Sequence, residues 1–232
     1  MRHRVIATSI FLLASAAAQA AGNFCGPINN AYGPFDYRKR FELPANLEIV
    51  ERVHFSEETE NGLKNAGTGS WGGDLDYTLR AWPNHTRALL AMSRLGAREK
   101  AVQLPGAKYP VDCYFDRALR FAPDDPAVHA VYANHLFSQG LIDRSLVEFK
   151  EAVALDPENP TINYNAGLAF LRAKDYDKAL FHAQKAYAKH FPLPGLKNKL
   201  VEAGKWVEPP PAPQDDKPAA EDPLPKDLKP AE

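Results

Sequence analysis

The sequence Ala118-Leu-Arg-Phe-Ala-Pro-Asp-Asp-Pro126 returns 34 residues later as Ala152-Val-Ala-Leu-Asp-Pro-Glu-Asn-Pro160. The leading alanines and both pairs of prolines are each separated by 34 positions. A fixed period of this length is typical of repeat proteins, in which each unit packs only against its neighbours. The chain is therefore predicted to be a stack of similar units.

Each repeat contains two stretches with helical spacing. After Pro126, apolar residues recur every three or four positions, and Gly140 can end this helix because glycine tolerates the left-handed conformation. A second stretch starts near Asp143 and ends before Pro157, since proline lacks the amide donor that a continuing helix needs. The repeat that starts at Pro160 has the same two stretches, so each unit is predicted to be a helix pair.

This pattern resembles the tetratricopeptide repeat (TPR) family, whose units are helix pairs with a period of 34 residues. The family's characteristic small, large and closing positions hold His129, Tyr132, Ala133, Leu136, Ser145, Phe149, Ala152 and Pro157 in one unit, and Asn163, Ala166, Gly167, Phe170, Ala179, Ala183, Ala186 and Phe191 in the next. An upstream helix repeats the spacing with Val111, Phe115, Ala118 and Pro123. The sequence departs from the family at Ala183, where a bulky residue is usual, and at Phe191, where a proline is usual.

The resemblance implies an all-α fold, a short right-handed superhelical stack of about three TPR helix pairs with a C-terminal capping helix. We expect this domain to span residues 83–206, with its leading helix starting at Pro83. The expected parts are units at about 83–123, 126–157 and 160–191 and the cap at 194–206. A loop over residues 102–109 makes the first unit irregular.

The segment before the repeats, residues 21–82, is predicted to be a mostly irregular extension that wraps on the first unit. Alternating apolar side chains over residues 46–55 favour an extended, strand-like segment. We expect short helices over residues 56–66 and 74–82. The glycine-rich residues 67–73 between them are expected to form a loop.

The first twenty residues have the layout of a secretory signal peptide. Arg2 and Arg4 precede an apolar run, and Ala18-Gln-Ala20 is a small-x-small cleavage site. The run is shorter than the roughly 20 residues of a spanning helix, although an uncleaved anchor is the alternative. We therefore expect a mature chain from Ala21 that has no transmembrane segment and is secreted across the inner membrane, into a bacterial periplasm.

The last part of the sequence has a different composition. Residues 207–232 contain eight prolines, seven acidic residues and three lysines, a net charge of −4. With so few apolar residues they cannot bury enough surface to offset the entropy of ordering. We expect a disordered, Pro-rich acidic tail, and the alternative is a polyproline-II recognition segment at 209–213.

Charge and cysteine content exclude several classes of protein. With 28 Lys and Arg against 29 Asp and Glu in 232 residues, the chain lacks the basic excess of a nucleic-acid-binding protein. Two cysteines are too few for a zinc or iron–sulfur site of their own. In an exported chain, Cys25 and Cys113 could form one disulfide, and the alternative is a buried free thiol at Cys113. No cofactor or metal is expected.

One group of residues suggests an enzyme. Asp74 and Asp76, with His54 and His85, could form a hydrolytic or metal-dependent site for which the repeats act as a scaffold. None of their spacings matches a known ligand motif, and Asp74 also suits a helix cap while His54 suits an exposed strand. Convergence of the four side chains on one pocket would favour this alternative, and scatter would argue against it.

The leading hypothesis is a non-catalytic adaptor, because TPR arrays leave a concave groove lined by the first helix of each pair. The resemblance implies groove positions at Ala130, Asn134, Phe137, Tyr164, Leu168 and Arg172. This mixed surface suits a peptide or helix of a protein partner, with Arg172 offering a planar fork to a carboxylate. Alternatively, Phe137 and Leu168 pack against the N-terminal extension.

Overall fold

The computed structural model describes residues 24–62 and 69–208. The expected signal peptide and almost all of the expected tail lie outside these residues. Every regular element in the described part is helical. The elements are η1 (Tyr37–Lys39), α2 (Pro44–His54), α3 (Glu57–Asn61), α4 (Trp71–Ala81), α5 (Thr86–Glu99), α6 (Val111–Phe121), α7 (Pro126–Ser138), α8 (Ile142–Leu155), α9 (Pro160–Arg172), α10 (Tyr176–Ala188) and α11 (Gly195–Glu202).

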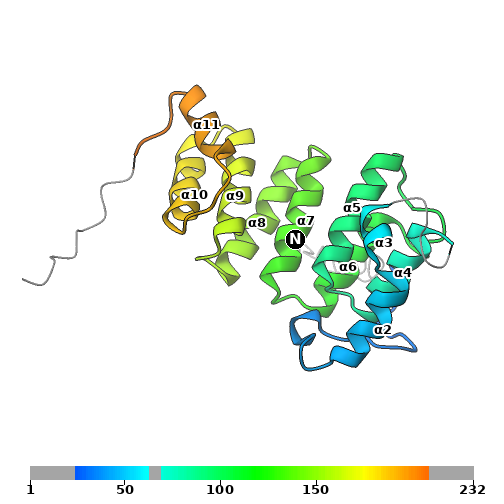
Figure 1. Ribbon diagram of the computed structural model, residues 1–232. Helices are drawn as coiled ribbons and strands as arrows, with labels where there is room; N and C mark the ends of the chain where they lie inside the picture. The colour runs from blue at the N-terminus through cyan, green and yellow to red at the C-terminus, as the bar shows by residue number, and fades with distance from the viewer. Residues whose placement is uncertain (1–23, 63–68, 209–232) are drawn as a thin grey trace, which may run out of the picture.

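Successive helix pairs stack along the molecule, as Figure 1 shows. The pairs α7–α8 and α9–α10 pack closely, α8 contacts α9, and α11 lies against the last pair. The predicted all-α stack of helix pairs is confirmed. No helix in the described ranges is long and apolar enough to cross a membrane.

Each repeated sequence stretch contains the last turn of one unit's second helix, the loop that follows it, and the cap of the next unit's first helix. Pro126 and Pro160 are the first residues of α7 and α9, where a missing amide hydrogen has no cost. The side chains of Asp125 and Asn159 precede them and accept hydrogen bonds from the first-turn amides. Gly140, with φ +78°, makes the turn after α7.

Small residues at the family positions let neighbouring helices approach. Ser145 on α8 is fully buried and donates its Oγ hydrogen bond to the carbonyl of Ala133 on α7, at 2.9 Å. A Cβ atom on Gly167 of α9 would lie only 2.5 Å from Leu196 Cδ2 of α11. The repeat pattern therefore fixes helix-to-helix distances as well as helix positions.

The first pair differs from the expectation at its start. Helix α5 begins at Thr86, not at Pro83, and the side chain of His85 caps it by accepting from the amide of Ala88 at 3.2 Å. A turn closed by the His85 amide and the Trp82 carbonyl precedes the helix. The prediction missed this because histidine is an uncommon cap.

The prediction of a strand-like segment over residues 46–55 is wrong, because residues 46–54 belong to α2 and Phe55 is its C-cap. Leu43, Leu47 and Val50 recur at helical spacing and pack with Trp82, whereas Ile49 and Val53 face solvent. Pro44 starts the helix at a favourable position. In the part that the structure describes, the extension is therefore largely helical, not mostly irregular as expected.

The next two boundaries also differ. Ser56 caps α3 as expected, but the helix ends at the left-handed Gly62, and residues 63–68 lie outside the described part. Helix α4 starts at Trp71 with Ser70 as its cap, so residues 71–73 of the expected loop are helical. Gly72 lies within this helix, and a larger residue would not fit there because its Cβ would lie 2.3 Å from the Pro105 carbonyl oxygen.

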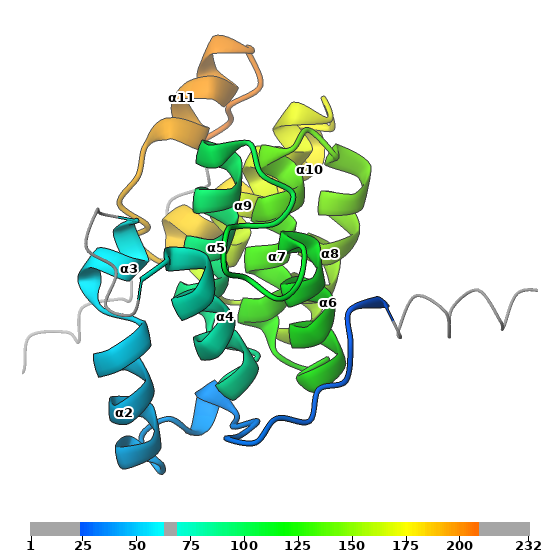
Figure 2. The same ribbon diagram turned by 90° about the vertical axis from the view of Figure 1, so that its right-hand side faces the viewer.

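A disulfide between Cys25 and Cys113 ties the start of the described chain to α6. Buried Arg117 donates to the carbonyl oxygens of Cys25 and Pro27, and Arg120 donates to that of Gly26. Figure 2 shows this segment passing beside α6 before the chain turns toward α2. The extension is thus a strap on the first helix pair.

Candidate functional site

A groove of about 650 Å³ opens over the C-terminal ends of α7 and α9 and is bordered by α11. Its apolar lining comes from Phe137, Leu168, Leu171 and Tyr176. Its cationic lining comes from Arg172, Lys174 and Lys199. The groove therefore combines an apolar floor with a positively charged rim.

These three cations have no acidic partner among the residues that the structure describes. Other lysines near this end of the molecule do: Lys185 and Lys189 pair with Glu158, and Lys197 pairs with Glu208 at 2.8 Å. An unpaired cation on a rim can bind an incoming carboxylate without first breaking an internal ion pair. The groove is thus open to an acidic ligand.

Three of the six predicted groove residues line this groove, namely Phe137, Leu168 and Arg172. Tyr164 and Ala130 do not, because both are buried. The Tyr164 ring packs on the ring of Phe191, with 4.5 Å between the ring centroids. Ala130 packs between helices in a cluster that includes Ile162.

The expectation that Tyr164 is exposed in the groove is therefore wrong, since the chain leading to α11 covers it. Asn134 is half-buried and lies outside the groove lining. Sequence reasoning missed Leu171, Lys174, Tyr176 and Lys199. Lys174 comes from the α9–α10 turn, Tyr176 from the start of α10 and Lys199 from α11, none of which the first-helix rule includes.

A second pocket, of about 270 Å³, lies beside the first, and Ser138 lines both. His135 on α7 bridges two polar groups at this pocket. Its Nδ1 lies 2.8 Å from Ser93 Oγ on α5, and its Nε2 lies 2.8 Å from Asp112 Oδ1 on α6. The bond from His135 holds the pKa of Asp112 below its usual range, so this carboxylate is charged at neutral pH.

Hydroxyl, imidazole and carboxylate in series are also the groups of a serine hydrolase. Here, however, Ser93 sits inside α5, where the backbone amides are already used by the helix. The amides of the α5 turn that holds Ser93 are therefore not free to stabilise an oxyanion, which is usually the largest catalytic contribution. The arrangement instead links three helices and gives the second pocket a polar wall.

The four residues of the enzyme hypothesis do not form one site. His54 Nδ1 contacts Asp74 Oδ1 at 2.9 Å, and Asp74 is fully buried within α4, so it is not a helix cap. His54 is a half-buried helical residue stacked on Tyr77, not an exposed strand residue. Asp76 turns elsewhere and accepts a hydrogen bond from the Tyr114 hydroxyl at 2.6 Å.

His85 has yet another partner, Glu51, at 3.0 Å. Burial lowers the pKa of His85, and the hydrogen bond from His85 lowers the pKa of Glu51. Within the described ranges, no three His, Cys, Asp or Glu side chains are placed to hold a metal ion. Scatter of the four residues removes the observation on which the enzyme alternative depended.

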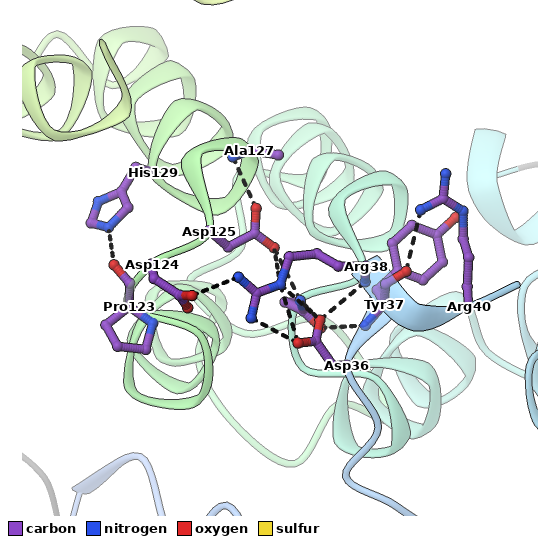
Figure 3. Close-up of polar contacts among 10 residues, drawn as sticks. Asp36, Tyr37, Arg38, Arg40, Pro123, Asp124, Asp125, Ala127 and His129 are labelled. Atoms are coloured by element: carbon purple, nitrogen blue, oxygen red, sulfur yellow. Dashed lines mark hydrogen bonds and ion pairs between the residues drawn. The ribbon is translucent and has the colours of Figure 1, made fainter. Parts of the chain in front are cut away.

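A polar network that sequence reasoning missed joins the extension to the repeats (Figure 3). Arg38 pairs with Asp36 at 2.7 Å and with Asp124 at 2.9 Å. Asn84 is buried and donates to both Asp36 and Asp125, and Asp125 also caps α7. The hydrogen bonds that Arg38 donates to Asp36 lower the pKa of Asp36 to about 2. The charges on this face are satisfied internally, unlike those of the groove.

Comparison with known proteins finds the repeat. A family model described as "TPR repeat" matches residues 133–174, which run from within α7 to the turn before α10. This match supports the TPR resemblance and, in general terms, a role in protein interaction. A solved structure titled "Crystal structure of MamA" is similar to this chain at 15% identity and a TM-score of 0.43, covering 85% of this chain and 100% of that one. A search of curated proteins gave no match.

Proposed function

We propose that this protein is a non-catalytic adaptor of the bacterial cell envelope that holds an acidic segment of a partner protein in its groove. One observation carries the proposal: Arg172, Lys174 and Lys199 border an apolar floor and form no ion pair within the described chain. Repeat arrays of this kind present such grooves as binding surfaces.

The groove suits a segment that alternates acidic and apolar side chains. The Arg172 guanidinium can donate two parallel hydrogen bonds to one carboxylate, while Lys174 and Lys199 act as point charges. Apolar side chains of the partner would cover Phe137 and Leu168, and burial of this surface adds affinity. The positive rim also speeds encounter with a negatively charged partner.

The second pocket extends this surface toward the first helix pair. Because Ser138 borders both pockets, an extended segment that leaves the groove passes the polar wall made by His135 and Asp112. A hydrogen-bonding side chain of the partner would be favoured there over an apolar one. The two pockets together would therefore select for sequence as well as charge.

Two features support the envelope setting. The first twenty residues have the composition of an export signal. Cys25 and Cys113 are disulfide-bonded, and stable disulfides are typical of oxidising compartments such as the periplasm. Retention of the mature protein in a periplasmic fraction, with its N-terminus at Ala21, would test this part of the proposal.

The binding proposal is tested with a charge variant and a matched control. The groove variant is Arg172→Ala, Lys174→Ala and Lys199→Ala. The control removes three cations that are exposed and outside the groove lining, by Lys39→Ala, Arg52→Ala and Lys150→Ala. Partners captured from periplasmic extract are identified, their bound segments are mapped, and the dissociation constants of synthetic segments are measured.

We expect the groove variant to lose about 30-fold or more in affinity, roughly 2 kcal/mol, because it removes three charge-assisted contacts. The control should change affinity less than threefold, and added salt should weaken the parent protein's binding. Equal losses in both variants, or a captured segment without acidic residues, would contradict the proposal.

A further inference from the structure

We propose that the chain's own acidic segment, residues 209–232, docks in the same groove and competes with the partner. This inference rests on the proposed function, because it concerns the regulation of that site. Three independent observations lead to this inference. They are the place where the described chain ends, the complementary charges of the groove and the segment, and the length of the segment.

The position of α11 brings this segment to the groove. Lys199 and Ala203 of α11 line the groove, and the described chain ends only five residues after Ala203, at Glu208. Glu208 already forms an ion pair with Lys197 of α11 at 2.8 Å. Lys197 is two positions from Lys199 and faces another side of α11, so the acidic segment starts on the helix that borders the groove and has to pass around α11 to enter it.

The acidic charges of the segment are complementary to the cations of the groove, although not to the net charge of the folded body. Residues 21–208 carry 23 basic and 23 acidic residues, so net charge does not attract the segment to the folded body. The groove, in contrast, gathers three cations that have no acidic partner in the described part of the chain. The segment offers two adjacent acidic pairs, Asp215-Asp216 and Glu221-Asp222, and its two leucines, Leu224 and Leu228, match the apolar floor.

The reach of the segment is sufficient. A proline-rich chain extends about 3.1 Å per residue, so Asp215 can lie about 20 Å from Glu208 and Leu228 about 60 Å. The groove begins on α11 itself, so neither distance is limiting. Proline also lowers the entropy that docking costs, because a polyproline-II segment is already extended.

Tethering makes even a weak contact effective. A short flexible linker gives an effective concentration in the millimolar range. At an effective concentration of about 1 mM, a contact with an intrinsic dissociation constant of about 0.1–0.2 mM would fill the groove most of the time, and the apparent affinity for a partner would fall by about five- to tenfold. A partner with higher intrinsic affinity displaces the segment, so the segment sets a threshold for binding.

The test compares three full-length proteins. One is the parent, and the second is a neutralised variant with Asp215→Asn, Asp216→Asn, Glu221→Gln and Asp222→Asn. The matched control removes four exposed carboxylates outside the groove lining, by Glu48→Gln, Glu57→Gln, Asp143→Asn and Glu151→Gln. The first measurement needs no partner: backbone amide NMR shifts of Leu168, Lys174 and Tyr176 are recorded at low and high salt.

We expect these groove amides to shift in the neutralised variant but not in the control, and the difference to vanish in about 0.5 M salt. The second measurement adds a synthetic peptide with the sequence of residues 209–232. The neutralised variant should bind this peptide about five- to tenfold more tightly than the parent, since its own segment no longer competes.

Identical groove shifts in the three proteins, or equal peptide affinity for parent and variant, would overturn the inference. Shifts that grow with protein concentration would also overturn it, because they would indicate docking between two copies. If partner capture depends on the groove cations while these measurements are negative, only this inference fails. If they are positive while no partner depends on the cations, only the proposed function fails.

Discussion

Replacing Phe149 with alanine tests whether interlocking side chains hold the second and third helix pairs together. Phe149 lies on α8 and is only 1% exposed. It forms one buried cluster with Ala133 of α7 and with Ala166 and Ala169 of α9. One large ring therefore fills the space that three small residues leave between three helices.

The expected cost is about 4 kcal/mol of unfolding free energy. Truncation of a buried phenylalanine usually costs about 3–5 kcal/mol, from lost burial and from the cavity left behind. The upper half of this range is expected because alanines on the facing helices have no side-chain freedom to fill the cavity. For a domain of about 150–250 residues, this corresponds to a fall in Tm of roughly 8–16 °C.

The assay is urea denaturation followed by circular dichroism, with two companion variants. Phe149→Leu keeps most of the volume and should cost far less than Phe149→Ala. Val147→Ala removes a side chain of the same helix that is 55% exposed, and should change stability by less than about 0.5 kcal/mol. A cost below about 1.5 kcal/mol for Phe149→Ala, or a comparable cost for Val147→Ala, would refute the interlocking model.

Four further outcomes are expected. Reduction of the Cys25–Cys113 disulfide should lower stability by about 4–5 kcal/mol, because the bond closes a loop of sequence separation 88, and a thermal melt with and without reductant measures this. Burial, together with the nearby charge of Lys185, lowers the pKa of His182 to about 4. The folded protein therefore resists protonation of His182, and its stability should fall by about 3 kcal/mol as the pH drops from 6.5 to about 4. This loss should be absent in His182→Gln. Tyr164→Ala should lower Tm because the ring is buried on Phe191, whereas Arg172→Ala should leave Tm unchanged. Tyr114→Phe should cost about 1–3 kcal/mol in urea denaturation, because it removes the hydroxyl that donates to buried Asp76, and an unchanged midpoint would contradict this.

The repeats could be predicted from the sequence because their signals are local and agree with one another. Asp125-Pro126 and Asn159-Pro160 each place a side-chain cap directly before a residue suited to the first helical turn. Because the units repeat with a fixed period, the small contact positions found in one unit predict those of the next, such as Ala166. Two helices in fixed register leave little freedom for the rest of the unit.

The errors arose where two patterns compete or where a distant segment decides burial. Residues 46–55 satisfy a strand alternation and a helical spacing at once, and packing of Val50 with Trp82 selects the helix. Tyr164 occupies a first-helix position that is open in an isolated pair, but Phe191 and the chain leading to α11 cover it. Local sequence patterns do not report such long-range packing.

The groove was half predictable for the same reason. Phe137, Leu168 and Arg172 follow from repeat geometry, because they lie on first helices. Lys174 and Lys199 come from a turn and from the capping helix, 25 positions apart in the sequence, and only the fold brings them to one rim. A cationic site assembled from separate elements leaves no contiguous motif to find.

The distribution of paired charges would favour the proposed binding at the end of the stack formed by α9, α10 and α11. Around the first helix pair, three arginines are already engaged: Arg38 of the strap pairs with Asp124, Arg87 of α5 pairs with Glu60 of the strap, and buried Arg117 of α6 donates to a strap carbonyl oxygen. These bonds stabilise the fold, and an incoming acidic ligand would have to break them. At the other end, Arg172 and Lys199 have no such partners within the described residues, so the same ligand gains contacts there without losing any.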